Sequence, residues 1–403
     1  MMPRFVMLSA LMFGLHTIAV AQGSRRPVNV SRPPRASALS IRLTDSTRAV
    51  LTRALAEGAF PGAIAVIGNK AGILASYGVG RLDAADATRP GITTIYDLAS
   101  LTKIIATTSL MLQLVDQGRV ALDTPAVRYL PDWHGTRASE ITVRQLLTHS
   151  SGLAAWRAFY KEATDKADAR AQLMLVSPDV QPGTRYLYSD MNFMLLGMIA
   201  ERLTGMPLDS AFQVLVAHPL KLADTRYRPD SSLRARIAPT EYDPWRQRVL
   251  RGEVHDENAS RFEGVSGHAG LFSTAADLAR VARMWMNGGT LDGVRFASSQ
   301  TVARFTRAQD TLISTRALGW ETPNGSNSAG HKFSAGAFGH TGFTGTSIWI
   351  DPARDVFVIL LTNRVNPTRE NRKIGGVRVA LADAVAGALD GVPRLSAPSA
   401  VAR

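Results

Sequence analysis

The most informative stretch of this chain is Ser100-Leu101-Thr102-Lys103. It follows an extended segment, Thr93-Thr94-Ile95-Tyr96-Asp97, and is expected to begin a long apolar helix. Residues three apart on a helix lie on the same side, so the Lys103 amine can hydrogen-bond the Ser100 hydroxyl. A serine hydroxyl alone is too weak an acid to attack a substrate near neutral pH. The stretch predicts a nucleophile, Ser100, activated by Lys103. The alternative is a surface lysine in the first turn of an ordinary helix.

The scarcity of lysine supports this interpretation. Only seven of the 46 basic residues are lysines, and the other 39 are arginines. Arginine stays protonated at any accessible pH, whereas a lysine that is desolvated or lies beside another cation can lose its proton and act as a base. Lys103 therefore has a chemical capability that the commoner arginine lacks.

A second motif, Tyr188-Ser189-Asp190, lies between a turn at Pro182-Gly183 and a helix-like run from Met194 to Thr204. Its position predicts a loop, from which the Tyr188 phenol can exchange a proton with a neighbouring hydroxyl. Beside a lysine ammonium the phenolate form becomes less costly. The alternative is a core tyrosine whose hydroxyl is satisfied by hydrogen bonds.

A third motif, His340-Thr341-Gly342, is expected to open a strand over residues 343–350. The mixture of Thr, Ile and Trp with close glycines favours an inner strand that another segment can approach closely. Such a strand edge can offer a backbone N–H to a developing oxyanion while the Thr341 and His340 side chains contact the substrate. The alternative is an ordinary strand start.

Together these motifs occur in the order and rough spacing of the serine β-lactamase and penicillin-binding protein superfamily, and the chain resembles its class C-like branch. The resemblance covers roughly residues 40–390. Three longer segments also resemble that branch: residues 141–153, 267–274 and 339–342. Concerted matches in the right order are far more specific than any single motif.

The resemblance implies an α/β (α+β) fold in which an antiparallel sheet is flanked by helices and interrupted by a mainly helical region, residues 124–270. The residue pattern agrees, because strands are expected only near the two ends of the chain, which excludes a doubly wound parallel sheet. The expected elements are a helix from Thr44 or Asp45 to Glu57, strands 62–68, 72–80, 346–350 and 356–362, and a last helix 376–389.

The resemblance also implies the role of each site residue. Ser100 is the nucleophile, Lys103 its activating partner and Tyr188 the proton shuttle to the leaving group. The backbone N–H groups of Ser100 and Phe343 form the oxyanion hole. The residues implied to contact the substrate are Asp190, His340, Thr341 and Gly342.

Two of these positions depart from the usual pattern, in which the third motif begins with Lys and the second ends in Asn. The departures are His340 and Asp190. A histidine is only partly charged near neutrality, and an aspartate adds an acceptor where an amide is usual. Both changes weaken a β-lactamase assignment. If the substrate carries a carboxylate, a nearby arginine should bind it, but the sequence does not say which.

The function expected from the resemblance is that of a secreted serine hydrolase cleaving an amide or ester bond through an acyl-serine. The favoured activities are a D-Ala-D-Ala carboxypeptidase-like, D-amino-acid peptidase or esterase activity. One alternative is a class C-like β-lactamase, and another is a non-catalytic penicillin-binding or cell-wall sensor protein. The substrate is expected to be a small molecule or a peptide, with a peptidoglycan-derived compound as one candidate, and the oligomeric state is left open.

The N-terminus predicts export. Arg4 precedes an apolar run to Val20, and Ala19-Val20-Ala21 has the small-x-small pattern of a signal peptidase site. The expected organisation is a signal peptide at residues 1–21, a basic Pro/Ser-rich linker at 22–39, a catalytic domain at 40–390 and a flexible tail at 391–403. The predicted location is periplasmic, with no stable membrane span after cleavage; the alternative for residues 5–20 is a membrane anchor.

Composition limits the remaining classes. The chain has no cysteine, so thiol nucleophiles and thiolate metal sites are excluded. The net charge of +13 comes without a nucleic-acid motif, so no nucleic acid partner is expected. The polar patch at residues 254–259 has three interpretations, a solvated loop, a substrate contact or a metal site, and no metal or cofactor is predicted. His149 is interpreted as a helix end with local hydrogen bonds.

Overall fold

The computed structural model describes residues 37–391. The predicted signal peptide, residues 22–36 of the predicted linker and residues 392–403 lie outside the described residues. The first helix, α1 (Ala38–Ala56), starts inside the expected linker because Ser37 caps it, its hydroxyl accepting from the Ser40 N–H at 3.1 Å.

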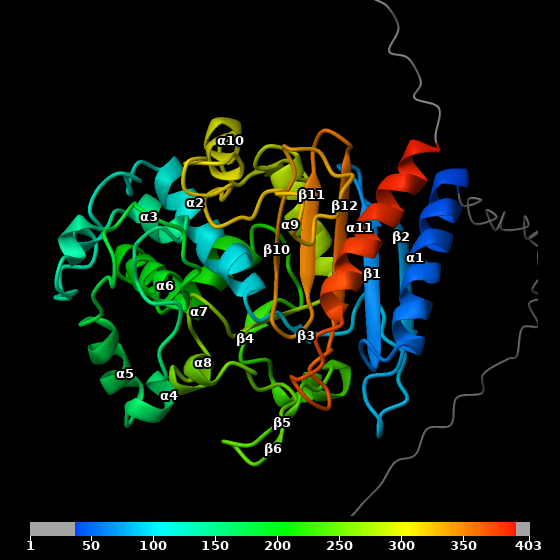
Figure 1. The fold of residues 1–403 in the computed structure, drawn as a ribbon, viewed down its shortest axis with the longest axis horizontal. Coiled ribbons are helices and arrows are strands. Elements are labelled where there is room, and N and C mark those ends of the chain that lie inside the picture. Colours follow the sequence, from blue (N-terminus) through cyan, green and yellow to red (C-terminus); the bar gives the residue numbers. More distant parts are fainter. Residues whose placement is uncertain (1–36, 392–403) are drawn as a thin grey trace, which may run out of the picture. The chain divides into compact units, whose positions relative to one another are not determined.

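The two ends of the chain build one antiparallel sheet, as predicted (Figure 1). Its strand order is β10-β11-β12-β1-β2, and every neighbouring pair is antiparallel. The strands are β1 (Gly62–Gly68), β2 (Ile73–Gly80), β10 (Phe338–Thr341), β11 (Ser347–Asp351) and β12 (Val356–Thr362). The central pair therefore joins residues about three hundred positions apart in the sequence, Ala63 with Thr362.

Strand β1 explains why both faces of the sheet are covered. All seven of its residues are buried. Ala63, Ala65 and Ile67 pack in one apolar cluster with α1 and α11 (Ile374–Asp390), while Ile64 and Val66 belong to the larger core on the other face. Alternate residues of a strand point to opposite faces, so this run of small and branched apolar residues requires a layer on each side. Helix α9 (Ala275–Met286) packs on that second face (Figure 1).

The region between the sheet segments is mainly helical in its first half and irregular in its second. Its helices and the remaining ones are α2 (Thr108–Asp116), α3 (Val143–Leu147), α4 (Phe159–Glu162), α5 (Lys166–Leu173), α6 (Asp190–Thr204), α7 (Leu208–Phe212), α8 (Glu257–Arg261) and α10 (Ser299–Thr306). Short helical turns lie at Lys103–Thr107, Ala126–Arg128, Ala138–Glu140, Gln213–Ala217 and Ser231–Arg236. Among residues 37–391, no helix is both long enough and apolar enough to cross a membrane.

The expectation that strands return only near residue 346 was wrong. Short two- and three-residue strands occur earlier, at β3 (Tyr96–Asp97), β4 (Arg226–Tyr227), β5 (Tyr242–Asp243), β6 (Arg248–Val249), β7 (Leu271–Ser273), β8 (Thr290–Leu291) and β9 (Val294–Arg295). Of these, β3, β7 and β4 form a small second sheet next to Ser100. Strands this short have no room for an alternating pattern, which is why the sequence did not reveal them.

The third motif also lies differently from the prediction. His340 and Thr341 end strand β10, and the chain then turns before β11 begins at Ser347. The turn uses Gly345 at φ +113°, a conformation that side chains with a Cβ rarely adopt. Gly342 is required for a different reason, since a Cβ there would lie 2.4 Å from the Leu98 carbonyl oxygen. The turn therefore lies directly against the segment that leads to Ser100.

A buried ionic network ties the inserted region to the loop before α11. The Glu241 carboxylate accepts from the His255 ring at 2.7 Å and from Arg369 Nε at 2.5 Å and the Arg369 backbone N–H at 2.8 Å. Burial alone would raise the pKa of Glu241, but these hydrogen bonds and charges lower it from 4.5 to about 2. The carboxylate is thus held ionised between two chain segments.

Substituting Gly342→Ala should lower the free energy of unfolding by about 1–3 kcal/mol, because the new Cβ overpacks against backbone. Gly376→Ala is the matched control: it is in α11, is exposed and has open space around it. That change should be neutral or stabilise by about 0.5–1 kcal/mol. Denaturant titration of both variants tests the close approach. Equal stabilities would contradict it.

The Glu241 network predicts a specific acid sensitivity. Because the folded-state pKa is depressed, its stabilisation is present above pH 4.5 and is lost as the pH falls toward 2. The contribution is on the order of 2 kcal/mol. Glu241→Gln should be less stable than the parent protein at pH 7, and the difference should shrink between pH 4.5 and 2. A pH-independent difference in urea unfolding would show that the ionised carboxylate is not responsible.

Candidate active site

Ser100 lies at the end of a strained approach. Ala99 adopts φ +47°, unusual for a residue with a side chain, and its N–H donates to the Asp97 carboxylate at 2.8 Å. Asp97 is buried and also accepts from the His255 N–H at 2.6 Å. The half-buried Ser100 then starts a continuous helical segment whose π-helical turn, Lys103–Thr107, leads into α2. The predicted helix is present, and a fixed turn presents the hydroxyl.

Lys103 is fully buried, and its Nζ has three partners. It donates to Ser100 Oγ at 2.9 Å and to the His268 carbonyl at 3.1 Å, and it lies 2.8 Å from Asp190 Oδ1. Burial would lower the pKa of Lys103, but the charge and hydrogen bond of Asp190, together with Tyr188, raise it above 10.5 instead. At rest Lys103 is therefore an ammonium, although a buried lysine can also lose its proton.

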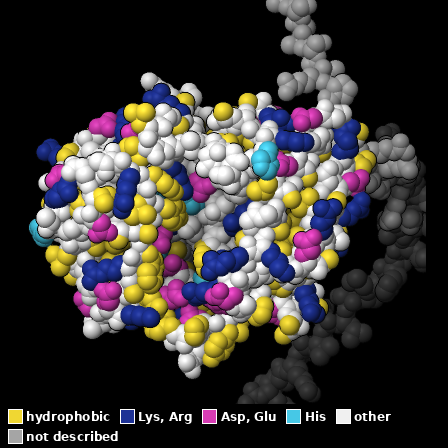
Figure 2. All heavy atoms as spheres, in the orientation of Figure 1, with side chains coloured by type: hydrophobic (Ala, Val, Ile, Leu, Met, Phe, Trp, Pro, Cys, Tyr) yellow, Lys and Arg dark blue, Asp and Glu magenta, His cyan; other side chains and the backbone are white. Residues whose placement is uncertain are grey.

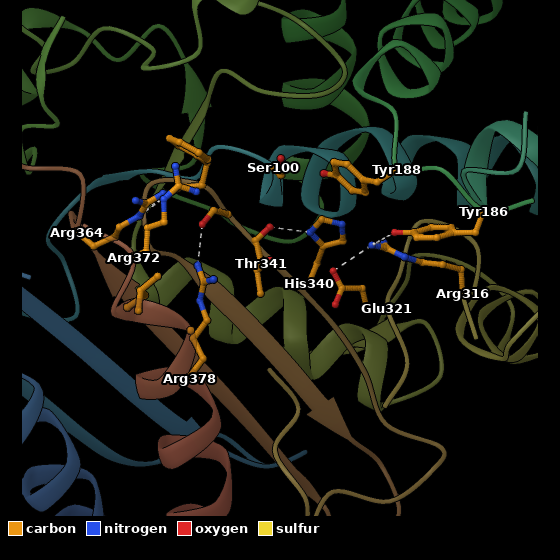
Figure 3. A pocket seen from close by; sticks show the side chains of 14 residues that line it. Ser100, Tyr186, Tyr188, Arg316, Glu321, His340, Thr341, Arg364, Arg372 and Arg378 are labelled. Carbon is orange, nitrogen blue, oxygen red and sulfur yellow. Dashed lines mark hydrogen bonds and ion pairs between the residues drawn. The ribbon is translucent and has the colours of Figure 1, made fainter. Parts of the chain in front are cut away.

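Tyr188 lies on a loop, as predicted, directly before α6. Its phenol oxygen points toward Ser100 (Figure 3), and the Lys103 ammonium lies 5.1 Å from its ring centroid. Burial raises the pKa of the Tyr188 phenol, and the Lys103 charge opposes that rise. The phenol is therefore neutral at rest and beside the nucleophile. Asp190, the third residue of the motif, is the first residue of α6 and the counter-ion of Lys103.

His149 positions Tyr188, a role that the sequence argument missed. Its ring packs on the Tyr188 ring at 4.4 Å between centroids, and its Nδ1 accepts from the Ser189 N–H at 3.1 Å. Asn192 contacts the same nitrogen at 3.2 Å. The predicted helix end is present, since α3 ends at Leu147 and the His149 N–H donates to the Leu146 carbonyl at 3.4 Å, but the partners of the ring lie about forty residues further along the chain. The only signal was a histidine beside Ser150 and Ser151, which was ambiguous.

Two backbone N–H groups are free near the nucleophile. Within residues 37–391, neither the Ser100 N–H nor the Phe343 N–H donates to a protein acceptor, and both residues line the same two cavities. Two side-chain bonds fix their relative positions: Thr344 Oγ1 donates to the Asp97 carbonyl at 2.8 Å and Thr346 Oγ1 to the Leu98 carbonyl at 3.0 Å. The arrangement suits an oxyanion.

His340 brings no positive charge to the site. Its Nδ1 donates to the Thr341 carbonyl at 2.8 Å, and the ring is almost completely buried. Burial, with the nearby Arg316 charge, holds the pKa of His340 well below 6.5. The ring is therefore neutral at neutral pH, with Nε2 as a hydrogen-bond acceptor. The partial positive charge expected on His340 from the sequence is therefore absent in the resting site.

Ser100 and His340 line a cavity with a volume of about 500 Å³ and a basic wall (Figure 3). The face drawn in Figure 2 is hollowed near its middle, where acidic and basic side chains gather. The sequence did not identify the arginines of this wall, which come from three separate segments. They are Arg316, Arg364, Arg372 and Arg378. Arginine is so common in this chain that composition hides the few that line the cavity.

A second cavity of about 420 Å³ opens on the other side of Ser100 and has an acidic wall. The polar patch at residues 254–259 contributes His255, Asp256 and Glu257, which favours its interpretation as a substrate contact over a solvated loop. Trp156 and Phe343, both about half exposed, complete the rim.

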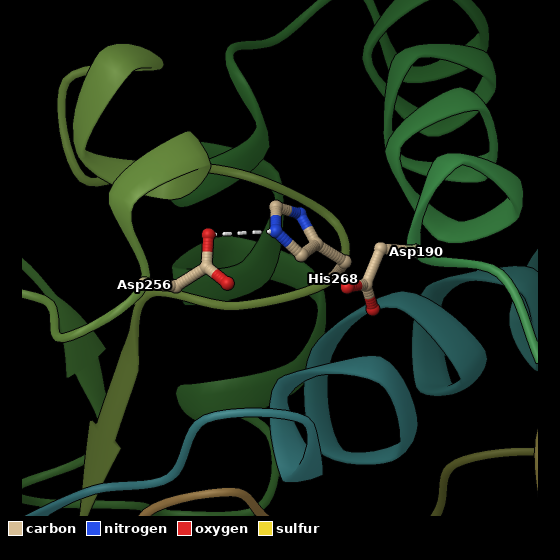
Figure 4. Close-up of side chains that lie close together, drawn as sticks. All are labelled: Asp190, Asp256 and His268. Atoms are coloured by element: carbon tan, nitrogen blue, oxygen red, sulfur yellow. Dashed lines mark hydrogen bonds and ion pairs between the residues drawn. The ribbon is translucent and has the colours of Figure 1, made fainter. Parts of the chain in front are cut away.

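Within residues 37–391, Asp190, Asp256 and His268 come close enough to one another to hold a metal ion, and the two aspartates line this cavity (Figure 4). One potential ligand atom of each lies within 4.8 Å of the others. All three are already engaged, since Asp190 pairs with Lys103 at 2.8 Å and Asp256 Oδ1 lies 3.0 Å from His268 Nε2. A divalent cation here would have to displace a buried ammonium. The Asp190 carboxylate is therefore the partner of Lys103, and the Asp256 carboxylate is the partner of His268.

Comparisons with known proteins identify the family of this chain. The family model described as Beta-lactamase matches residues 47–382. An N-acetylmuramyl-L-alanine amidase of Bacillus subtilis is 35% identical, with 78% of this chain and 79% of that protein covered. A putative D-alanyl-D-alanine carboxypeptidase of Salmonella agona is 32% identical, with 70% and 72% covered. A penicillin-binding protein homologue from Caulobacter crescentus, 22% identical, has the same fold, with a TM-score of 0.69 over 86% of this chain and 97% of that one. The chain belongs to the β-lactamase family of serine hydrolases.

Proposed function

We propose that this protein is a secreted amidase that hydrolyses an amide bond in a peptidoglycan-derived compound through an acyl-Ser100 intermediate. The observation that carries the proposal is the Ser100 hydroxyl, 2.9 Å from the Lys103 Nζ, at the junction of two cavities and beside two free backbone N–H groups. The names of the two curated relatives support it, since both refer to amide bonds of the bacterial wall. Export rests on the pattern of residues 1–21 alone.

In the proposed reaction, Ser100 Oγ attacks the amide carbon and the new oxyanion accepts from the Ser100 and Phe343 N–H groups. The Ser100 proton passes to Lys103 as Lys103 gives one of its own to Asp190, along contacts of 2.9 and 2.8 Å. The net result is a transfer from serine to carboxylate. In this proposal the Asp190 carboxylate is the acceptor, a role for which an asparagine amide is unsuited.

Tyr188 completes the proposed cycle. As the C–N bond breaks, the phenol gives its proton to the leaving nitrogen and recovers one from the Lys103–Asp190 pair. Water then attacks the acyl-Ser100 ester, with its proton taken along the same route. His149 contributes by holding the Tyr188 ring, and it stays neutral because burial holds its pKa well below 6.5.

Ser100→Ala should abolish covalent labelling by a fluorophosphonate probe and lower amide hydrolysis by about a thousandfold or more. Intact-mass spectrometry measures the label, and chromatography of products measures hydrolysis. Suitable substrates are N-acetylmuramyl-L-alanyl-D-isoglutamine, a D-Ala-D-Ala peptide, a p-nitrophenyl ester and a penicillin. Ser109, buried on the same helix, provides the control variant Ser109→Ala, which should keep the label. Turnover of the ester or the penicillin alone would replace the amidase proposal with one of those activities.

Asp190→Asn should slow the labelling of Ser100, because the proton acceptor is removed, and should shift its pH dependence toward lower pH. The carboxylate is what holds the Lys103 pKa above its ordinary value, so its removal leaves burial to lower that pKa. The alkaline limb in which Lys103 loses its proton therefore moves toward neutrality. Labelling rates between pH 5 and 11, in both proteins, test this. An unchanged profile would remove Asp190 from the proton route.

A further inference from the structure

The acidic cavity of about 420 Å³ beside Ser100 has more negative than positive charge in and behind its wall. Three carboxylates line it, those of Asp190, Asp256 and Glu257. Among the residues that the structure describes, Arg369 is the one basic residue of this wall. Behind the wall, Lys103 pairs with Asp190 and Glu241 pairs with Arg369. Four carboxylates therefore face two permanent cations, and the nearby histidines add positive charge only when they are protonated.

Two of these carboxylates keep an oxygen free for a ligand. Asp256 Oδ1 accepts both from the His268 ring at 3.0 Å and from the Ala259 N–H at 2.7 Å, whereas Oδ2 makes no hydrogen bond within residues 37–391 (Figure 4). Glu257 Oε1 accepts from Arg369 at 2.7 Å, and its Oε2 is free in the same sense. The Asp256 and Glu257 side chains are 24% and 17% exposed, and both free oxygens retain accessible surface.

His255 adds a nearly buried acceptor to the same wall. The residue is 4% exposed and lines the cavity. Its Nε2 lies 2.7 Å from Glu241 Oε1, and since a carboxylate only accepts, Nε2 carries the proton and Nδ1 of the neutral ring is an acceptor. Nδ1 makes no hydrogen bond within the described residues, yet, unlike the sealed Nε2 of His340, it keeps accessible surface. An unpartnered polar atom in a nearly buried side chain is costly, which indicates a donor in the cavity.

The rim of the cavity contributes an aromatic face that is open to a cation. Trp156 lines the cavity and is 48% exposed. The other aromatic residues here are already covered, since Arg364 lies 4.5 Å from the Phe343 ring centroid and two arginines lie 5.6 Å from that of Trp245. No lysine or arginine among residues 37–391 lies over the Trp156 ring in this way. Of the aromatic side chains, an indole ring attracts cations most strongly.

We infer that the acidic cavity is a subsite for a primary ammonium group of the substrate. An ammonium has three N–H donors and no acceptor, which matches free acceptors on Asp256, Glu257 and His255. Its charge balances part of the carboxylate excess, and Trp156 can cover it from the rim. A carboxylate or phosphate would be repelled here. The inference rests on the proposed function and makes it more specific: the hydrolysed amide carries a protonated amine, at a peptide N-terminus or on a side chain.

The first test measures binding without turnover. Benzylammonium and benzyl alcohol have nearly the same shape and differ in the charged group. Each is present during fluorophosphonate labelling of Ser100, which intact-mass spectrometry follows. Benzylammonium should halve the labelling rate at a concentration at least about tenfold below that of benzyl alcohol, because hydrogen bonds between charged groups are stronger than neutral ones. Equal protection by the two compounds would overturn the subsite.

Two variants locate the effect. Asp256→Asn removes a charge but keeps an oxygen that can cap α8, and Trp156→Leu removes the aromatic face. Each should reduce the advantage of benzylammonium by about three- to tenfold. Trp245→Leu is the matched control, because Trp245 is 40% exposed but lies outside the cavity wall, and it should leave the advantage unchanged. An advantage that persists in both Asp256→Asn and Trp156→Leu would contradict the inference.

Two pairs of amides identify where the ammonium lies in the substrate. N-acetylmuramyl-L-alanyl-D-isoglutaminyl-L-lysine and its norleucine analogue differ in a side-chain ammonium. D-Ala-D-Ala and D-lactyl-D-Ala differ in the N-terminal ammonium. In at least one pair, the member with the ammonium should have a kcat/KM about tenfold or more higher. Equal values within both pairs would overturn the inference.

The outcomes separate this inference from the proposed function. Hydrolysis of wall-derived amides at equal rates with and without an ammonium would leave the amidase standing and would overturn the ammonium subsite. Selective protection of Ser100 by benzylammonium, without hydrolysis of any amide, would support the subsite and would overturn the amidase.

Discussion

The whole site depends on one buried ammonium. Lys103 is fully enclosed, and burying an unpaired charge is prohibitive, so its surroundings must supply partners. They come from three segments: Ser100, one turn earlier, Asp190 at the start of α6, and the His268 carbonyl from the loop before β7. The need to satisfy this charge brings the nucleophile, the helical region and the small second sheet to one point.

The same constraint decides the electrostatics of the cleft. Asp190 keeps Lys103 charged, while burial keeps Tyr188 and His340 neutral, so the ion pair beside Ser100 is next to two neutral rings. The two cavities that meet at Ser100 differ in their walls. One has an acidic and aromatic wall around Asp256, and the other has a basic wall that includes Arg316. A substrate that spans both sides would meet different chemistry on each side of the cleaved bond.

The sheet and the Ser100–Lys103 pair could be predicted from the sequence. The features that were missed have a physical reason in each case. The pair Ser100 and Lys103 is local, so helical spacing was enough to predict the contact that the structure shows at 2.9 Å. The sheet was predicted from strand-like segments at the two ends of the chain, in agreement with the family resemblance. The role of His149 and the placement of Arg316 depend on contacts between distant segments, which no local pattern records. The end of β10 at Thr341 was missed because a close glycine turn interrupts an otherwise strand-like run.

The most direct measurement is a crystal structure of the protein acylated by a slowly hydrolysed amide derived from peptidoglycan. The account predicts an ester on Ser100 Oγ, with its carbonyl oxygen within hydrogen-bond distance of the Ser100 and Phe343 N–H groups. An ester on another residue would contradict the mechanism.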